Sequence, residues 1–237
     1  MAERIFLQVD GLRFSYPECA VLNGLSLAWP PGLALVRGDE SSGKTTLLRL
    51  LAGELAVQAG RITLQGTSPD EAPKAYVQKV FWADPRSGDL DTLTARGWLD
   101  SLPVRYPLWD TAALDAHTEG FALHEHLHKP FYALSTGSKR KVLMAGALAS
   151  GAPLTLIDEP VGGLDKPSAT YLGRALAQVA GQPGRVVVVV DVNMVLVRMK
   201  RFSINVCTLF VPNFVLERKK LAVKNWYFIG SHQLLCS

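Results

Sequence analysis

The stretch from Gly38 to Thr46 constrains the fold of this chain more than any other. It reads Gly-Asp-Glu-Ser-Ser-Gly-Lys-Thr-Thr and matches the spacing G-x-x-x-x-G-K-[ST] of a phosphate-binding loop. The apolar run Leu33–Val36 before it predicts a buried strand, and the residues after it, up to Gly53, carry an apolar helical pattern. A chance Gly/Ser-rich turn would not explain why a strand and a helix flank the loop.

The residue types of this loop explain how it binds a triphosphate. Glycines at both ends allow tight turns, so that backbone amides face inward and the start of the helix adds positive potential. Lys44 supplies a full charge for the β- and γ-phosphates, and the Thr45 hydroxyl is placed to ligate Mg²⁺. The predicted nucleotide-binding residues of the loop are Gly38, Asp39, Glu40, Ser41, Ser42, Gly43, Lys44, Thr45 and Thr46.

Composition favours a globular protein of the cytoplasm. The 237 residues are 48% hydrophobic and 19% charged, with only three cysteines and no signal-peptide pattern at the start. The window nearest to a membrane span, 202–216, is too short to cross a bilayer. Residues 1–191 carry 18 basic and 20 acidic side chains, so we expect no nucleic-acid partner for this part.

Apolar patterns outside the loop predict a mixed α/β fold. Strands are expected within residues 5–29 and at 61–65, which form an antiparallel sheet, and residues 75–82 are a further strand candidate. Residues 91–134 are prone to form helices, with one buried face predicted from Leu93, Trp98, Leu99 and Leu102. The histidines of this stretch, at positions 117, 124, 126 and 128, lack the Cys or carboxylate cluster that would favour a metal site over ordinary packing.

A second acidic motif stands where ligands bind in open α/β sheets. The apolar run Leu154–Ile157 ends in Asp158 and Glu159, and another run, 185–190, predicts a second buried strand. Asp158 is suited to hold Mg²⁺, and Glu159 is suited to orient and polarise a water molecule. Strands that alternate with helices predict a parallel sheet.

Together these motifs resemble the ATP-binding cassette (ABC) ATPases, over about residues 3–191. Leu134-Ser-Thr-Gly-Ser138 resembles the family signature Leu-Ser-Gly-Gly-Gln, with Ser135 and Gly137 retained, and lies 24 residues before Asp158, the usual interval. Gly163-Leu-Asp165 resembles the D-loop. Tyr16 matches the aromatic residue that stacks on adenine, and the alternative for it is a tyrosine packed at a sheet edge.

The resemblance implies a P-loop NTPase core with a parallel sheet, a flanking antiparallel β subdomain and a helical subdomain inserted at about 85–150. It implies a subunit that binds and hydrolyses ATP with Mg²⁺, with Glu159, Lys44 and Asp84 as catalytic residues. It further implies that the signature of a second cassette, in a homodimer or heterodimer, closes the ATP site. The basic residues at 139–141, which follow the signature, are expected to be solvated or to face a partner.

The role in transport follows from the same resemblance. Because this chain shows no membrane span, transport implies a separate transmembrane permease subunit that holds the cassette at the cytoplasmic face. The alternatives are an ATP-gated dimerisation module with little hydrolysis and a soluble cassette outside transport.

Two positions depart from the family pattern. Where the family has a Gln between the strand and the helical subdomain, this sequence has Asp84, with Gln78 as a weaker candidate. We expect that the shorter carboxylate of Asp84 can still reach Mg²⁺ or water. Where the family has a His after the strand at 186–190, this sequence has Asp191, and His232 lies too far along the chain to replace it.

The segment 192–237 does not match the family. It holds seven basic residues and one acidic residue, and four of the five asparagines of the chain. A native accessory segment with a basic face and a change of reading frame near residue 191 both explain this shift, and we favour the second from composition alone.

Overall fold

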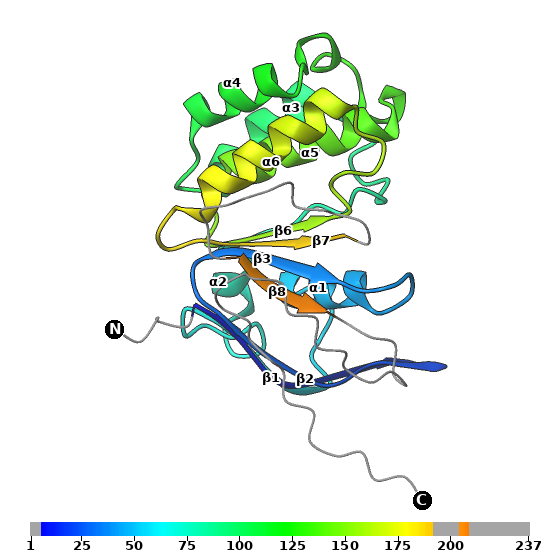
Figure 1. Ribbon diagram of the computed structural model, residues 1–237, viewed down its shortest axis with the longest axis vertical. Coiled ribbons are helices and arrows are strands. Elements are labelled where there is room, and N and C mark those ends of the chain that lie inside the picture. The colour runs from blue at the N-terminus through cyan, green and yellow to red at the C-terminus, as the bar shows by residue number, and fades with distance from the viewer. Residues whose placement is uncertain (1–5, 192–203, 209–237) are drawn as a thin grey trace, which may run out of the picture.

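Two sheets and a layer of helices are stacked in the protein (Figure 1). The structure is a computed structural model that describes residues 6–191 and the backbone of residues 204–208. The larger sheet has five parallel strands in the order β5-β6-β7-β3-β8. Its strands are β3 (Gly32–Arg37), β5 (Val80–Phe81), β6 (Leu154–Asp158), β7 (Val186–Val190) and β8 (Ile204–Thr208).

The smaller sheet is antiparallel and precedes most of the core in sequence. Its order is β2-β1-β4, built from β1 (Leu7–Tyr16), β2 (Cys19–Trp29) and β4 (Ala59–Leu64). The prediction of an antiparallel sheet flanking a parallel core is therefore confirmed. The predicted strands within residues 5–29 form two long strands joined by the turn at 17–18.

The helices divide between two places. α1 lies between the two sheets, whereas α3 to α6 gather on the opposite face of the core sheet (Figure 1). None of the helices that the structure describes is both long and apolar enough to cross a bilayer. The α-helices are α1 (Lys44–Ala52), α2 (Pro73–Val77), α3 (Ala95–Ser101), α4 (Thr111–Gly120), α5 (Thr136–Ala149) and α6 (Lys166–Ala180), and the short 3₁₀ turns are η1 (Leu102–Val104), η2 (His124–His126) and η3 (Phe131–Ala133).

Alternating side chains of the core strands supply two apolar cores. Leu33 and Leu35 of β3 pack with the helical layer, whereas Ala34 and Val36 pack with α1 and the antiparallel sheet. Because successive side chains of a strand point to opposite faces, a continuous apolar strand fills both cores at once. This double burial fixes β3 between its neighbours and therefore fixes where the phosphate loop begins.

Two details differ from the sequence-based expectations. Residues 75–82 do not form one strand, because α2 ends at Val77 and only Val80 and Phe81 pair with β6. Trp98, Leu99 and Leu102 are buried as expected, whereas Leu93 is 44% exposed. The boundaries at 85, 150 and 191 stay predictions.

Residues beyond 191 still contribute to the core sheet. The backbone of β8 pairs in parallel register with β3, from Leu33 opposite Ile204 to Arg37 opposite Thr208. The question of a changed reading frame otherwise lies outside the described residues.

Candidate active site

The phosphate loop joins β3 to α1 through two residues in left-handed conformations. Ser41 has φ 61° and Gly43 has φ 87°, and a Cβ atom on Gly43 would lie 2.5 Å from the Val21 side chain. Lys44 is buried, and its Nζ donates to the carbonyl oxygens of Gly38 at 2.8 Å and Asp39 at 2.5 Å. The ammonium group is therefore held inside its own loop, where it faces any phosphate that the loop binds.

Thr45 and Asp158 meet although 113 residues separate them. The Thr45 hydroxyl donates to Oδ2 of Asp158 at 3.0 Å, where the start of α1 lies beside the carboxyl end of β6. Asp158 is 4% exposed, and its Oδ1 has no hydrogen-bond partner in the part of the chain described. Burial raises the pKa of Asp158, while Arg86 and the Thr45 hydroxyl act in the opposite direction.

Arg86 also reaches this pair of residues. Its Nη2 donates to the Thr45 hydroxyl at 2.9 Å and contacts Oδ2 of Asp158. Asp84 accepts a hydrogen bond from the backbone amide of Arg86 at 2.9 Å and lies 3.6 Å from its Nε. The carboxylate of Asp84 therefore faces Arg86. No motif in the sequence singles out Arg86, although it is the one basic residue between positions 80 and 95.

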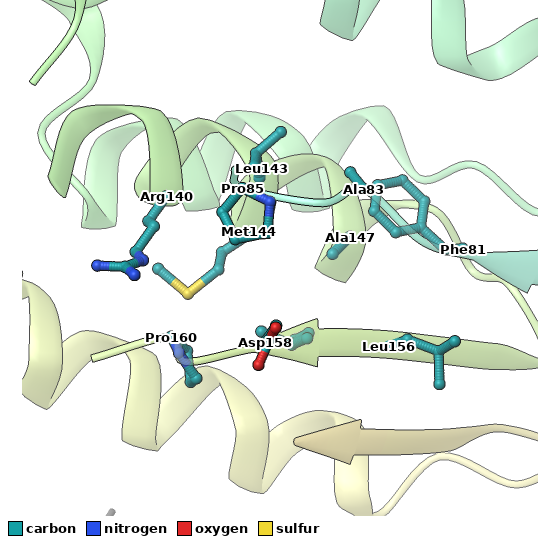
Figure 2. A pocket seen from close by; sticks show the side chains of 11 residues that line it. Phe81, Ala83, Pro85, Arg140, Leu143, Met144, Ala147, Leu156, Asp158 and Pro160 are labelled. Atoms are coloured by element: carbon teal, nitrogen blue, oxygen red, sulfur yellow. The ribbon is translucent and has the colours of Figure 1, made fainter. Parts of the chain in front are cut away.

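Glu159 follows directly and adopts a strained backbone conformation. Its φ is 45°, uncommon for a residue with a side chain, and its amide donates to Val190 of β7 at 2.8 Å. Its carboxylate lies 3.5 Å from Nη2 of Arg140, and Nη1 of the same arginine donates to the carbonyl of Gly162 at 2.5 Å. Arg140 is not simply solvated, because its side chain is 15% exposed and extends from α5 toward the turn after β6 (Figure 2), whereas a partner at this position stays a prediction.

The signature turn packs against the loop that resembles the D-loop. Ser135 caps α5, its hydroxyl accepting from the amide of Ser138. A Cβ atom on Gly137 would lie 2.2 Å from the carbonyl oxygen of Gly163. No hydrogen bond or ion pair within the described residues joins Ser135 or Gly137 to the phosphate loop of the same chain.

Lys141 adds an ion pair between α5 and the loop that resembles the D-loop. Lys141 Nζ lies 2.6 Å from Oδ2 of Asp165, whose other oxygen caps α6 at the amide of Ser168. The Lys141 hydrogen bond, with those from Ser168, lowers the pKa of Asp165. Helices α5 and α6 therefore begin side by side, at one end of the helical layer.

The two remaining candidates lie outside this cluster. Tyr16 ends β1 with 39% of its surface exposed and packs edge-on against Phe14, with 5.1 Å between ring centroids. That arrangement is compatible with adenine stacking and with edge packing, so the role of Tyr16 stays a prediction. Gln78 directly follows α2 as its C-terminal cap, and its backbone amide donates to the carbonyl oxygens of Lys74 and Tyr76.

A pocket lies beside Asp158, between strands β5 and β6 and helix α5. It is open to solvent, and its volume of about 310 Å³ includes the open mouth. Phe81, Leu143 and Met144 give it apolar walls, while Arg140 and Asp158 supply its polar groups (Figure 2). The acidic end of β6 therefore lines a pocket on the side of the helical layer, although the Asp158 side chain itself is buried.

Curated relatives cover most of the described chain. The cytochrome c biogenesis ATP-binding export protein CcmA of Sphingopyxis alaskensis is 33% identical over 174 residues, which are 73% of this chain and 83% of that protein. The protein of the same name from Rhodospirillum rubrum is 34% identical over 178 residues, which are 72% of this chain and 73% of that protein.

Solved structures agree on the fold. A dimeric ATP-binding cassette in a post-hydrolysis state with ADP and Pi has a TM-score of 0.70 at 18% identity, over 87% of this chain and 96% of that one. cbiO1 of Clostridium perfringens, part of the ABC transporter complex cbiONQ, has a TM-score of 0.64 at 21% identity, over 86% and 85%.

The family model described as "ABC transporter" matches residues 22–162, which hold the phosphate loop, the signature turn and the acidic pair. The chain therefore belongs to the ABC transporter family, as a subunit that binds and hydrolyses ATP.

Proposed function

We propose that this chain hydrolyses Mg²⁺–ATP between two cassettes and thereby drives export through a separate membrane permease. The observation that best supports this proposal is the hydrogen bond between Thr45 and Asp158, because it joins the phosphate loop to the acidic end of β6. Such a junction is what an in-line attack on a γ-phosphate requires, with the phosphates on one side and the water on the other.

The residues at this junction fit Mg²⁺. Thr45 and Asp158 offer hard oxygen donors, and Oδ1 of Asp158 is buried without a hydrogen-bond partner among the described residues. Bound Mg²⁺ would neutralise the negative charge that develops on the phosphates. Thr45 and Asp158 would hold it, as two ligands beside the phosphates themselves.

The side chains around ATP then take separate roles. Lys44 and the loop amides hold the phosphates and stabilise their charge. Glu159 accepts the proton of the attacking water. The ion pair with Arg140 keeps its carboxylate close to the end of β6.

A second cassette completes the site in this proposal. One phosphate loop leaves the far side of the triphosphate open to water. Ser135 and Gly137, at the start of α5, would meet that side from the partner copy, where the N-terminal end of the helix favours negative charge. Sealing the site in this way excludes bulk water.

The export role and the membrane partner are inferred from the names of the relatives. Those relatives are named cytochrome c biogenesis ATP-binding export proteins, and the name supports an export role in cytochrome c biogenesis. A permease subunit would then anchor the cassette at the cytoplasmic face of the membrane.

Removing the charge of Glu159 tests the enzymatic role. We expect Glu159→Gln to lower the rate of phosphate release by at least about a hundredfold, because it deletes the general base. The affinity for ATP, measured by equilibrium titration with a fluorescent ATP analogue, should stay near that of the unaltered protein. Glu125→Gln makes the same chemical change at an exposed site in η2 and should leave phosphate release unchanged.

One observation favours a second function, that of an ATP-gated dimerisation module with little turnover. Asp191, rather than the His of the family pattern, directly follows β7. That function predicts that ATP converts the chain to a dimer in light scattering, while the unaltered protein releases no more phosphate than Glu159→Gln.

A further inference from the structure

Arg86 places a positive charge between the two proposed metal ligands. Its guanidinium contacts Oδ2 of Asp158 and donates to the Thr45 hydroxyl, so it touches both side chains that the proposed function assigns to Mg²⁺. The Asp158 side chain is 1% exposed, whereas that of Arg86 is 53% exposed. A solvent-facing arginine thus reaches inward to a buried carboxylate.

We propose that Arg86 is a built-in competitor of the divalent cation, which neutralises Asp158 in the nucleotide-free chain and must leave before the metal is bound. This inference rests on the proposed function in one respect, namely that Thr45 and Asp158 are the metal ligands. It makes Arg86 an autoinhibitory group of the site rather than a catalytic residue.

The geometry makes the two cations mutually exclusive. Arg86 contacts Oδ2 of Asp158 and the Thr45 hydroxyl, so that of the proposed ligand atoms only Oδ1 of Asp158 has no partner among the described residues. A divalent cation bound to Oδ1 and to Thr45 would share the carboxylate and the hydroxyl with the guanidinium, and the two cations would repel each other strongly within a protein site. Binding of either cation therefore requires the other to move away.

Arg86 is free to leave at little cost. It belongs to no helix or strand, and more than half of its side chain is in contact with water. An arginine that swings outward from such a position regains full hydration. The contact is therefore strong enough to fill the site and weak enough to be displaced by Mg²⁺–ATP.

Asp84 holds Arg86 in place. Its carboxylate accepts from the backbone amide of Arg86 and lies beside Nε of the same residue. An amide side chain at position 84 would accept the same hydrogen bond without attracting the guanidinium by charge. The carboxylate at position 84, where the family pattern has a Gln, thus acts on Arg86 and is a positioning residue for it.

The test measures metal binding directly, without turnover. Mn²⁺ is titrated into the full chain in the presence of a non-hydrolysable ATP analogue, and free Mn²⁺ is read from its electron paramagnetic resonance signal. We expect Arg86→Gln to bind Mn²⁺ about fivefold more tightly than the unaltered chain, which is the scale of a half-exposed ion pair. Arg86→Lys retains the charge and should stay closer to the unaltered protein.

Two control variants make the outcomes distinct. Arg96→Gln deletes an arginine of similar exposure that pairs with Asp100 on α3, and it should leave Mn²⁺ affinity unchanged. Asp158→Asn should lower Mn²⁺ binding to that of the ATP analogue alone, titrated without protein. If Asp158→Asn does so while Arg86→Gln binds no more tightly than the unaltered chain, the competition is refuted and the metal site stands. If Asp158→Asn binds Mn²⁺ as before, the metal site of the proposed function is refuted, and the competition with it.

Discussion

Replacing Gly137 by alanine would test how closely the signature turn packs on the loop at 162–165. The new Cβ atom would lie 2.2 Å from the carbonyl oxygen of Gly163, about 1 Å inside ordinary van der Waals contact. The obstacle is a backbone atom, and Arg140 ties the neighbouring carbonyl of Gly162 to the same helix. The start of α5 and the loop must therefore separate by about that distance.

The separation sets the size of the effect. Overpacking of this kind costs about 1–3 kcal/mol, which for a domain of this size lowers the melting temperature by about 2–10 °C. Activity should fall further, because a displacement of about 1 Å in a catalytic assembly can lower the rate by about a hundredfold. Thermal melting of the nucleotide-free chain measures the first effect, and steady-state phosphate release measures the second.

Gly173 provides a matched control within α6. A Cβ atom there meets nothing within 4 Å, so Gly173→Ala should stabilise the protein slightly, by about 0.5–1 kcal/mol. If Gly137→Ala melts and hydrolyses ATP like Gly173→Ala, the close packing of Gly137 on Gly163 is refuted. A lower melting temperature with unchanged phosphate release would instead mean that the contact stabilises the fold without positioning the signature.

Two further substitutions test buried polar groups of the helical layer. Arg185→Met should destabilise the protein by about 1–3 kcal/mol in chemical denaturation, because the guanidinium of Arg185 donates to the carbonyls of Ala147 and Leu148 at the end of α5; unchanged stability would show that these carbonyls find other partners. Burial, assisted by the positive charge of Arg185, lowers the pKa of His117 to about 4. The folded protein therefore takes up a proton on His117 only at a lower pH than the unfolded chain does. Stability should therefore be complete above about pH 6.5 and fall by up to about 3 kcal/mol as the pH drops toward 4, and His117→Gln should flatten this part of the profile in melts recorded between pH 7 and 5. A profile that His117→Gln leaves unchanged would contradict the assignment.

The parallel core could be predicted because its strands carry one strong signal. β3, β6 and β7 are short apolar runs that end at turn or polar residues, and burial on both faces demands such runs. For residues 75–82, in contrast, the prediction of one strand was wrong. Their apolar and β-branched character suggested a strand, but Pro73 favours the start of a helix, and the Tyr76 hydroxyl bonds the carbonyl of Leu51 to hold α2 on α1.

The acidic pair and the phosphate loop were predictable, whereas their arginine partners were not. A motif states which residue types lie near one another along the chain, so Lys44, Thr45 and Asp158 could be placed from spacing alone. Arg86 and Arg140 reach the site from outside those motifs. Their positions depend on how the chain between β5 and β6 folds back over the sheet, which a local pattern does not encode.

The pairing of both acidic residues with arginines has a consequence for how the site works. Asp158 contacts Arg86 and Glu159 contacts Arg140, and both arginines belong to the segment predicted as the helical insertion, 85–150. The proposed exchange of Arg86 for a metal would break the first of these ion pairs and leave the second in place. Glu159 would then stay tied to α5 through Arg140, while Asp158 would be released from the segment that holds Arg86.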